Sequence, residues 1–125
     1  MLERLLVIAL GGAVGAVLRY LGSEATYRIL GRGFPYGTLA VNVVGSFCIG
    51  YLFAGFTERF SVGALWHAAL FAGLLGGFTT FSAFSLDTMQ MIQSGQIGKA
   101  LLNIVLSVGF CLAGAWGGMT VAKVY

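Results

Sequence analysis

Four long runs of apolar residues, almost free of charge, constrain the fold of this chain more than any other feature. A helix needs roughly 20 apolar residues to cross the hydrocarbon core of a membrane, and the runs lie at about residues 5–21, 37–56, 62–93 and 100–122. Only 9% of the residues are charged, whereas a soluble domain usually carries about a quarter. The sequence therefore predicts an all-α integral membrane protein, with four transmembrane helices in a single domain, residues 1–125.

Other classes of protein are disfavoured by the same pattern. A membrane β-barrel alternates apolar and polar residues in segments of about ten, whereas these runs are continuously apolar. The basic residues are scattered, so the net charge of +3 suits anionic lipid headgroups better than nucleic acid. The sequence contains no nucleophile–base pair, metal-binding cluster or nucleotide loop, so we expect no enzyme. No clear cleavage site follows the first run, and we expect it to remain as a membrane span.

Basic residues near the ends of the runs are balanced between the two sides of the membrane. Four spans place three basic residues on each side, Arg4, Arg59 and Lys123 on one and Arg28, Arg32 and Lys99 on the other. This count leaves out Arg19, which lies within the first run. Orientation follows the excess of Lys and Arg in short flanking loops, and here there is almost none. We expect dual topology, with insertion both ways up; control of the orientation by one loop charge or by the insertion machinery is the alternative.

Glycines recur four residues apart within the runs, at Gly73 and Gly77 and again at Gly114 and Gly118. Small residues at this spacing let helix backbones approach closely in lipid, so close packing within the bundle is the simplest interpretation. A chain of four helices is also too small to enclose a transport pathway comfortably. Close helix faces and a balanced orientation together favour an antiparallel homodimer with two-fold symmetry.

The third run is too long for one straight span. As a single helix it would measure about 48 Å at 1.5 Å per residue, whereas the hydrocarbon core is about 30 Å thick. The sequence predicts a break near residues 76–80, where Gly76 and Gly77 are followed by Thr79 and Thr80. Broken backbone at membrane depth is tolerated only where it is buried in protein or lines a water-filled cavity. The carbonyl groups that a break frees can hold a cation.

Aromatic rings and hydroxyl groups recur every third residue after the glycine pair, at Phe78, Phe81 and Phe84 and at Thr79, Ser82 and Ser85. Such a ridge of rings is usually a packing surface. An aromatic ring also has a positive edge, and a hydroxyl can donate a hydrogen bond in place of lost water. Together they are typical of a pathway for a small, strongly hydrated anion, which a fully charged lining would bind too firmly to release.

Other polar residues within the runs are few, and each has two interpretations. Arg19 either extends to the lipid headgroups or places a fixed positive charge at the mouth of an anion pathway. Asn42 and Thr38 are four residues apart and share a helix face; the amide either bonds to another helix or donates to an anion. Asn103 and Ser107, also four apart, give the fourth run one polar stripe.

Three segments of the sequence carry a family resemblance. GGAVGAVLRY, GTLAVNVVGSF and GGFTTFSAFS resemble, in order and spacing, the signature segments of the Fluc (CrcB) fluoride channel family. The resemblance implies an antiparallel homodimer in a bacterial or archaeal plasma (inner) membrane. It further implies two pores that pass cytoplasmic fluoride outward down its gradient and so lower its toxicity, and a sodium ion at the dimer centre.

The resemblance also implies roles for residues that match the motifs. Phe81 and Phe84 match the paired phenylalanines of the fluoride path, Asn42 matches its asparagine, and Arg19 matches the vestibule arginine. The remaining polar residues assigned to the pathway are Thr38, Thr80, Ser82 and Ser107. The sodium ligands would be the main-chain carbonyls of Gly76 and Thr79. Three positions depart from common family residues, with Ala83 in place of threonine, Asp87 in place of glutamate and Cys111 in place of serine.

Two other functions are compatible with the composition. A small proton-coupled multidrug antiporter is similarly short, but it needs a carboxylate deep in a span, and here only Asp87, late in the third run, approaches that. A non-transporting membrane subunit would use its glycines and phenylalanines only to pack partner helices. Replacing Asp87 tests the first alternative, and ion movement into or out of liposomes tests the second.

Overall fold

The computed structural model describes residues 1–58 and 63–125, and none of these residues forms a strand. The helices, in chain order, are α1 (Leu2–Leu30), α2 (Tyr36–Glu58), α3 (Ala64–His67), the π-helix η1 (Ala68–Leu75), α4 (Gly76–Phe78), α5 (Phe81–Gln93) and α6 (Ile97–Val124). Within the described residues, four helical stretches are long and apolar enough to cross a membrane, the third running from α3 to α5. The predicted fold of four spans is confirmed. The predicted start of the third span, Val62, and the loop residue Arg59 lie outside the described residues.

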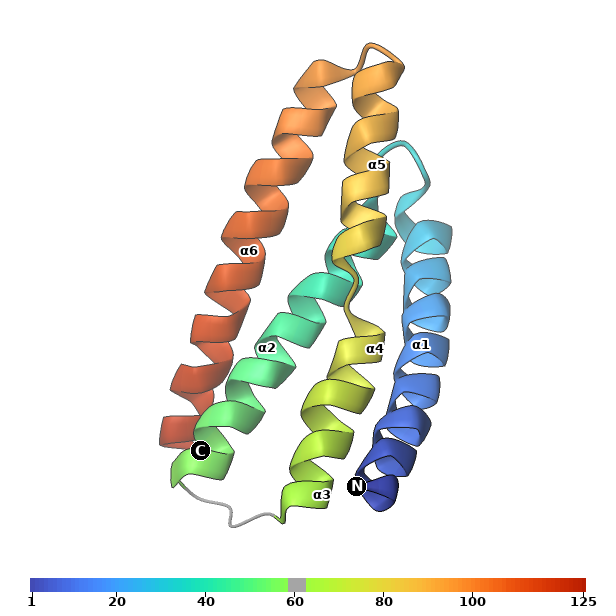
Figure 1. The fold of residues 1–125 in the computed structure, drawn as a ribbon. Helices are drawn as coiled ribbons and strands as arrows, with labels where there is room; N and C mark the ends of the chain where they lie inside the picture. Colours follow the sequence, from blue (N-terminus) through green and yellow to red (C-terminus); the bar gives the residue numbers. More distant parts are fainter. Residues whose placement is uncertain (59–62) are drawn as a thin grey trace.

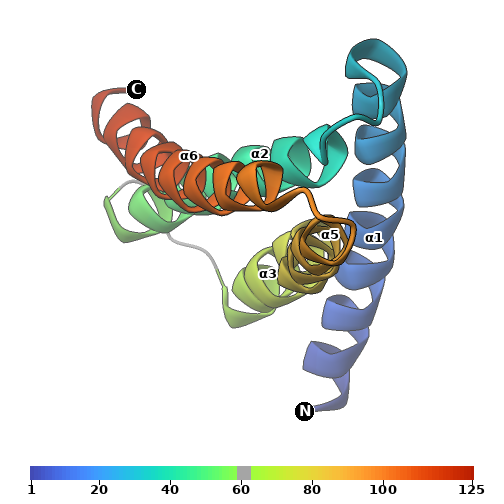
Figure 2. The same cartoon turned by 90° about the horizontal axis from the view of Figure 1, so that it is seen from above.

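The four spans form a bundle with two principal contacts. α2 packs chiefly against α6, and α1 packs chiefly against η1 and α4. Seen from above, α1 runs along one side of the third span, while α2 and α6 lie together on another side (Figure 2). The two chain ends lie at the same end of the bundle, and the short turn between α5 and α6 lies at the opposite end (Figure 1).

Glycines lie where the paired helices approach most closely. A Cβ added at Gly15 of α1 would meet the carbonyl oxygen of Leu74 in η1, and one added at Gly118 of α6 would meet that of Phe47 in α2. Neither position has room for a larger side chain, because the neighbouring atoms belong to the backbone of the facing helix. The predicted glycine-mediated packing of the spans is confirmed.

α1 extends well beyond the predicted end of the first span and includes much of the expected first connection. No glycine or proline interrupts the sequence between Gly22 and Gly31, and the Thr26 hydroxyl donates to the Gly22 carbonyl at 2.8 Å. The helix ends at Gly31, whose φ of 84° favours a residue without a side chain. Just beyond, Arg32 bonds to the Glu24 carboxylate at 2.9 Å, and this bond and the carboxylate charge raise the pKa of the Arg32 guanidinium.

The third span is interrupted between α4 and α5, as Figure 1 shows. Thr79 has a ψ of 156° and Thr80 has φ and ψ of −150° and 110°, so both residues are extended. The break falls within the predicted window, but at the two threonines, while Gly76 and Gly77 remain helical. Thr80 also caps α5, since its hydroxyl oxygen accepts a hydrogen bond from the Ala83 amide.

The segment before the break is wound as a π-helix, which the sequence did not predict. The amide of Gly76, at the end of η1, donates to the carbonyl of Phe71 five residues earlier, and also to that of Gly73. π-helical segments are rare and frequently occur at functional sites. In this chain η1 carries Phe71 and Leu75 to the wall of the cavity described next.

Candidate functional site

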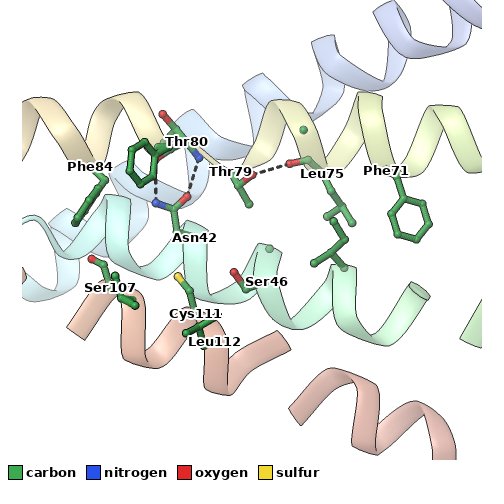
Figure 3. A pocket seen from close by; sticks show the side chains of 15 residues that line it. Asn42, Ser46, Phe71, Leu75, Thr79, Thr80, Phe84, Ser107, Cys111 and Leu112 are labelled. Atoms are coloured by element: carbon green, nitrogen blue, oxygen red, sulfur yellow. Dashed lines mark hydrogen bonds between the residues drawn. The ribbon is translucent and has the colours of Figure 1, made fainter. Parts of the chain in front are cut away.

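A cavity of about 470 Å³ lies between α2, the third span and α6. Seven of the ten residues assigned to the pathway or to sodium from the sequence line it, namely Asn42, Gly76, Thr79, Thr80, Phe81, Phe84 and Ser107. They come from three different spans, and the close-up in Figure 3 shows the side chains of Asn42, Thr79, Thr80, Phe84 and Ser107 around one space. The fold therefore gathers most of these residues, from distant parts of the sequence, at a single site.

Asn42 of α2 holds the break in the third span. Its Oδ1 accepts a hydrogen bond from the Thr80 amide at 2.7 Å, and its Nδ2 donates to the Thr80 carbonyl at 3.0 Å (Figure 3). The side chain thus takes the place of the helical partner of the Thr80 amide and makes an additional contact with the Thr80 carbonyl. Because an asparagine amide has two N–H groups, one remains available after these contacts.

The side chains around the break divert amides that would otherwise bond within a helix. In an uninterrupted helix each amide donates to the carbonyl four residues earlier, so the Thr80 amide would donate to Gly76 and the Ala83 amide to Thr79. Instead, Thr80 donates to Asn42, and Ala83 donates to the Thr80 hydroxyl at 3.1 Å. The carbonyls of Gly76 and Thr79 are therefore released from those helical bonds.

The two phenylalanines of the predicted pathway contact each other at the cavity. The ring centroids of Phe81 and Phe84 are 5.3 Å apart and the rings are tilted by 48°. Phe84 is half-buried, whereas the Phe81 side chain is 77% exposed in the single chain. The Phe81 ring therefore stands at the open side of the cavity and has little cover from its own chain.

Ser107 lies at the end of a directed chain of hydrogen bonds between α6 and α5. It donates to Asn103 Oδ1 at 3.2 Å, Asn103 Nδ2 donates to Thr88 at 3.0 Å, and Thr88 donates to the Phe84 carbonyl at 2.8 Å. Asn103 is only 2% exposed. The polar stripe predicted on the fourth span therefore faces inward and links two helices.

Three of the predicted pathway residues do not line this cavity. Thr38 donates to the Asp87 carboxylate at 2.8 Å, one turn of α2 away from Asn42. Asp87 lines a second cavity of about 340 Å³ near the connection after α1. Ser82 is exposed, and its hydroxyl lies 3.2 Å from that of Thr80. Arg19 is half-buried on α1 and lines neither cavity.

Ser46 is a polar residue of the cavity that the sequence analysis did not single out. It lies four residues after Asn42 and thus on the same face of α2, so the spacing already used for Thr38 would have identified it. Across residues 1–58 and 63–125, no three His, Cys, Asp or Glu side chains are grouped as metal ligands.

Most of the chain matches one protein family and several named relatives. The family model described as "CrcB-like protein, Camphor Resistance (CrcB)" matches residues 6–119. A relative from Magnetococcus marinus is 50% identical over 93% of this chain and 94% of its own length, and one from Vibrio vulnificus is 49% identical over 93% and 92%. A relative from Methylococcus capsulatus is 48% identical over 95% of this chain, which spans only 52% of that longer protein. All three relatives are named "Fluoride-specific ion channel FluC".

Proposed function

The chain belongs to the CrcB-like protein family, and on that basis we propose that it is a fluoride-selective ion channel. It passes fluoride out of the cytoplasm down the electrochemical gradient and so lowers fluoride toxicity. The names of the relatives are those of ion channels, not of enzymes. With four helical stretches in the described residues able to span a membrane, the protein is a multi-pass membrane protein, and we place it in the bacterial or archaeal inner membrane.

The observation that carries this proposal is the cavity in which Phe81, Phe84 and Asn42 meet. A small anion entering it must exchange its water shell for protein groups. The positive ring edges offer weak electrostatic attraction, and the free N–H of Asn42 offers a hydrogen bond. Neither group carries a full charge, so the ion is stabilised without being held too firmly to leave. The carboxylate of Asp87 does not line this cavity, which favours an anion channel over a proton-coupled cation antiporter.

We propose that a sodium ion is bound at the break by the main-chain carbonyls of Gly76 and Thr79. The proposal is supported by the diversion of the Thr80 and Ala83 amides to side chains, because this leaves both carbonyls able to accept a new partner. Sodium is a hard cation, and unwound backbone carbonyls at membrane depth are suitable ligands for it. Bound there, it would add positive charge beside the anion path.

A second copy of the chain, antiparallel to the first, completes the proposed channel. The Phe81 ring is 77% exposed at the open side of the cavity, so a partner surface is needed to enclose the anion. Two-fold symmetry would bring a second pair of carbonyls to the sodium ion and would create two equivalent pores. Close balance of the basic residues at the span ends supports insertion in both orientations.

The proposed function is tested by fluoride efflux from liposomes that contain the purified protein. We expect fast passive fluoride efflux with little chloride efflux. Replacing Asn42 with aspartate should slow fluoride efflux by about tenfold or more, since it loses a hydrogen bond to a charged ligand worth about 1.5–3 kcal/mol. Replacing Phe81 with isoleucine removes the positive ring edge and should also slow fluoride efflux. Phe110→Ile is the matched control, because Phe110 is exposed on α6 and does not line the cavity.

Native protein that passes no fluoride would refute the proposal and favour a non-transporting subunit. Equal fluoride efflux by the native protein and both cavity variants would instead show that the anion travels elsewhere. Cation export that is lost on replacing Asp87 would favour the antiporter.

A further inference from the structure

Four hydroxyl groups line the cavity, on Ser46, Thr79, Thr80 and Ser107. A hydroxyl carries one proton and can donate only one hydrogen bond at a time. An anion needs donors, so a hydroxyl whose proton is already bonded within the protein presents lone pairs to it instead. The hydrogen bonds of the structure therefore decide which of the four can bind fluoride.

Both threonine hydroxyls are hydrogen-bonded near the break, and that of Thr79 is fixed as a donor, whereas in the contact between Thr80 and Ser82 either hydroxyl can donate. Thr79 donates to the carbonyl of Leu75 at 3.0 Å, within its own helix (Figure 3). Thr80 accepts from the Ala83 amide, and its hydroxyl shares one hydrogen with that of Ser82 at 3.2 Å. Both hydroxyls serve the backbone geometry of the break.

The proton of Ser107 is directed away from the cavity by the chain of bonds described above. A carbonyl can only accept, so the Thr88 hydroxyl must donate to Phe84, and the group of Asn103 that faces Thr88 must be its NH₂. Asn103 Oδ1 then faces Ser107 and takes its proton. Because Asn103 is 2% exposed, no water can replace that proton if Ser107 turns away, and a buried unpaired acceptor is costly.

Ser46 is different, because its hydroxyl has no hydrogen-bond partner among residues 1–58 and 63–125. Every fully buried side-chain oxygen or nitrogen in the described residues has a hydrogen-bond partner. Because the Ser46 oxygen has none, it is not fully buried. The second N–H of Asn42 is likewise free. Four residues separate the two side chains, which places them about 6 Å apart along the axis of α2, both at the cavity (Figure 3).

We propose that Ser46 is an anion-binding residue of the channel, and that Ser46 and Asn42, not Ser107, donate hydrogen bonds to fluoride in the cavity. The inference rests on the proposed function. Two neutral donors about one helical turn apart give the ion successive positions, so that each hydrogen bond is replaced by the next as the ion moves. Ser107 instead serves as a fixed part of the contact between α5 and α6.

The test compares serine-to-alanine variants at two positions of the same cavity. We expect Ser46→Ala to reduce fluoride efflux from liposomes by about tenfold or more and to raise the fluoride concentration that gives half-maximal flux. Ser107→Ala should lose several-fold less flux. Ser46→Thr, which keeps the hydroxyl, should retain most of the flux. Thr120→Val is the control, because that hydroxyl donates to the Trp116 carbonyl away from the cavity.

Ser46→Cys keeps the size of the side chain but has only a weak donor, and it provides the same test if the alanine variant folds poorly. We expect it to be monodisperse and to lose flux as Ser46→Ala does. A larger loss in Ser107→Ala than in both Ser46 variants would overturn the inference, as would native flux in Ser46→Ala or Ser46→Cys. Either result with active native protein leaves the proposed function intact, whereas native protein without fluoride flux refutes the function itself.

Discussion

Replacing Asn42 with leucine tests whether one side chain holds the break in the third span. The change keeps a similar size but removes both bonds to Thr80, at 2.7 and 3.0 Å. Hydrogen bonds between membrane helices contribute on average about 0.6 kcal/mol and at most about 1.7, so the pair contributes about 1.2–3.4 kcal/mol. Thr80 is only 8% exposed, so water can replace the lost partners only in part. We therefore expect a loss near the upper value, about 3 kcal/mol.

The loss is measured by reversible unfolding in detergent, at one protein concentration because the stability of the proposed dimer would depend on concentration. Cys48 and Cys111 are half-buried and free, so a thiol-reactive dye reports their exposure as the chain unfolds. A change of about 3 kcal/mol shifts the unfolding constant by more than a hundredfold. Thr120→Val removes a hydroxyl that bonds only within α6 and serves as the control. If Asn42→Leu unfolds like this control, the break does not depend on Asn42.

Two further predictions concern packing and the polar contact near the second cavity. Gly15→Ala places a Cβ against the Leu74 carbonyl and should cost about 1–3 kcal/mol of unfolding free energy. Gly109 has open space around it, so Gly109→Ala should change the unfolding free energy by less than about 1 kcal/mol. Equal stabilities of the two variants would contradict the close approach of α1 and η1. Thr38→Val removes the 2.8 Å bond to Asp87 and should cost about 0.6–1.7 kcal/mol. Thr38→Ser should restore it, and a valine variant as stable as the native chain would show that the bond contributes nothing.

The number and order of the spans could be predicted because the length of an apolar run is a property of the linear sequence. The position of the break could be predicted only to within a few residues. The predicted window, residues 76–80, holds two glycines and two threonines, and the extended residues within it are Thr79 and Thr80. The position within the window arises from Asn42, which lies 38 residues away in the sequence from the residue it holds.

The residues that line the cavity could be predicted more completely than the contacts between them. Seven assigned residues meet at one cavity, because motifs in three spans supply polar groups at helical spacing. The direction of the hydrogen bond from Ser107 depends on Asn103 and on Thr88 of another helix, which no local pattern reveals. Ser46 was missed because a lone serine in an apolar run usually bonds to its own helix.

Asn42 makes two hydrogen bonds with the third span and is also the proposed anion donor, so one side chain has both a structural and a functional role. Any replacement that alters how position 42 would bind an anion also removes at least one hydrogen bond to the extended residue Thr80. Evolution would therefore have little freedom to alter the proposed permeation through this position. Adjustments among related proteins should accumulate instead at positions such as Ser46, whose side chain makes no hydrogen bond within the described residues.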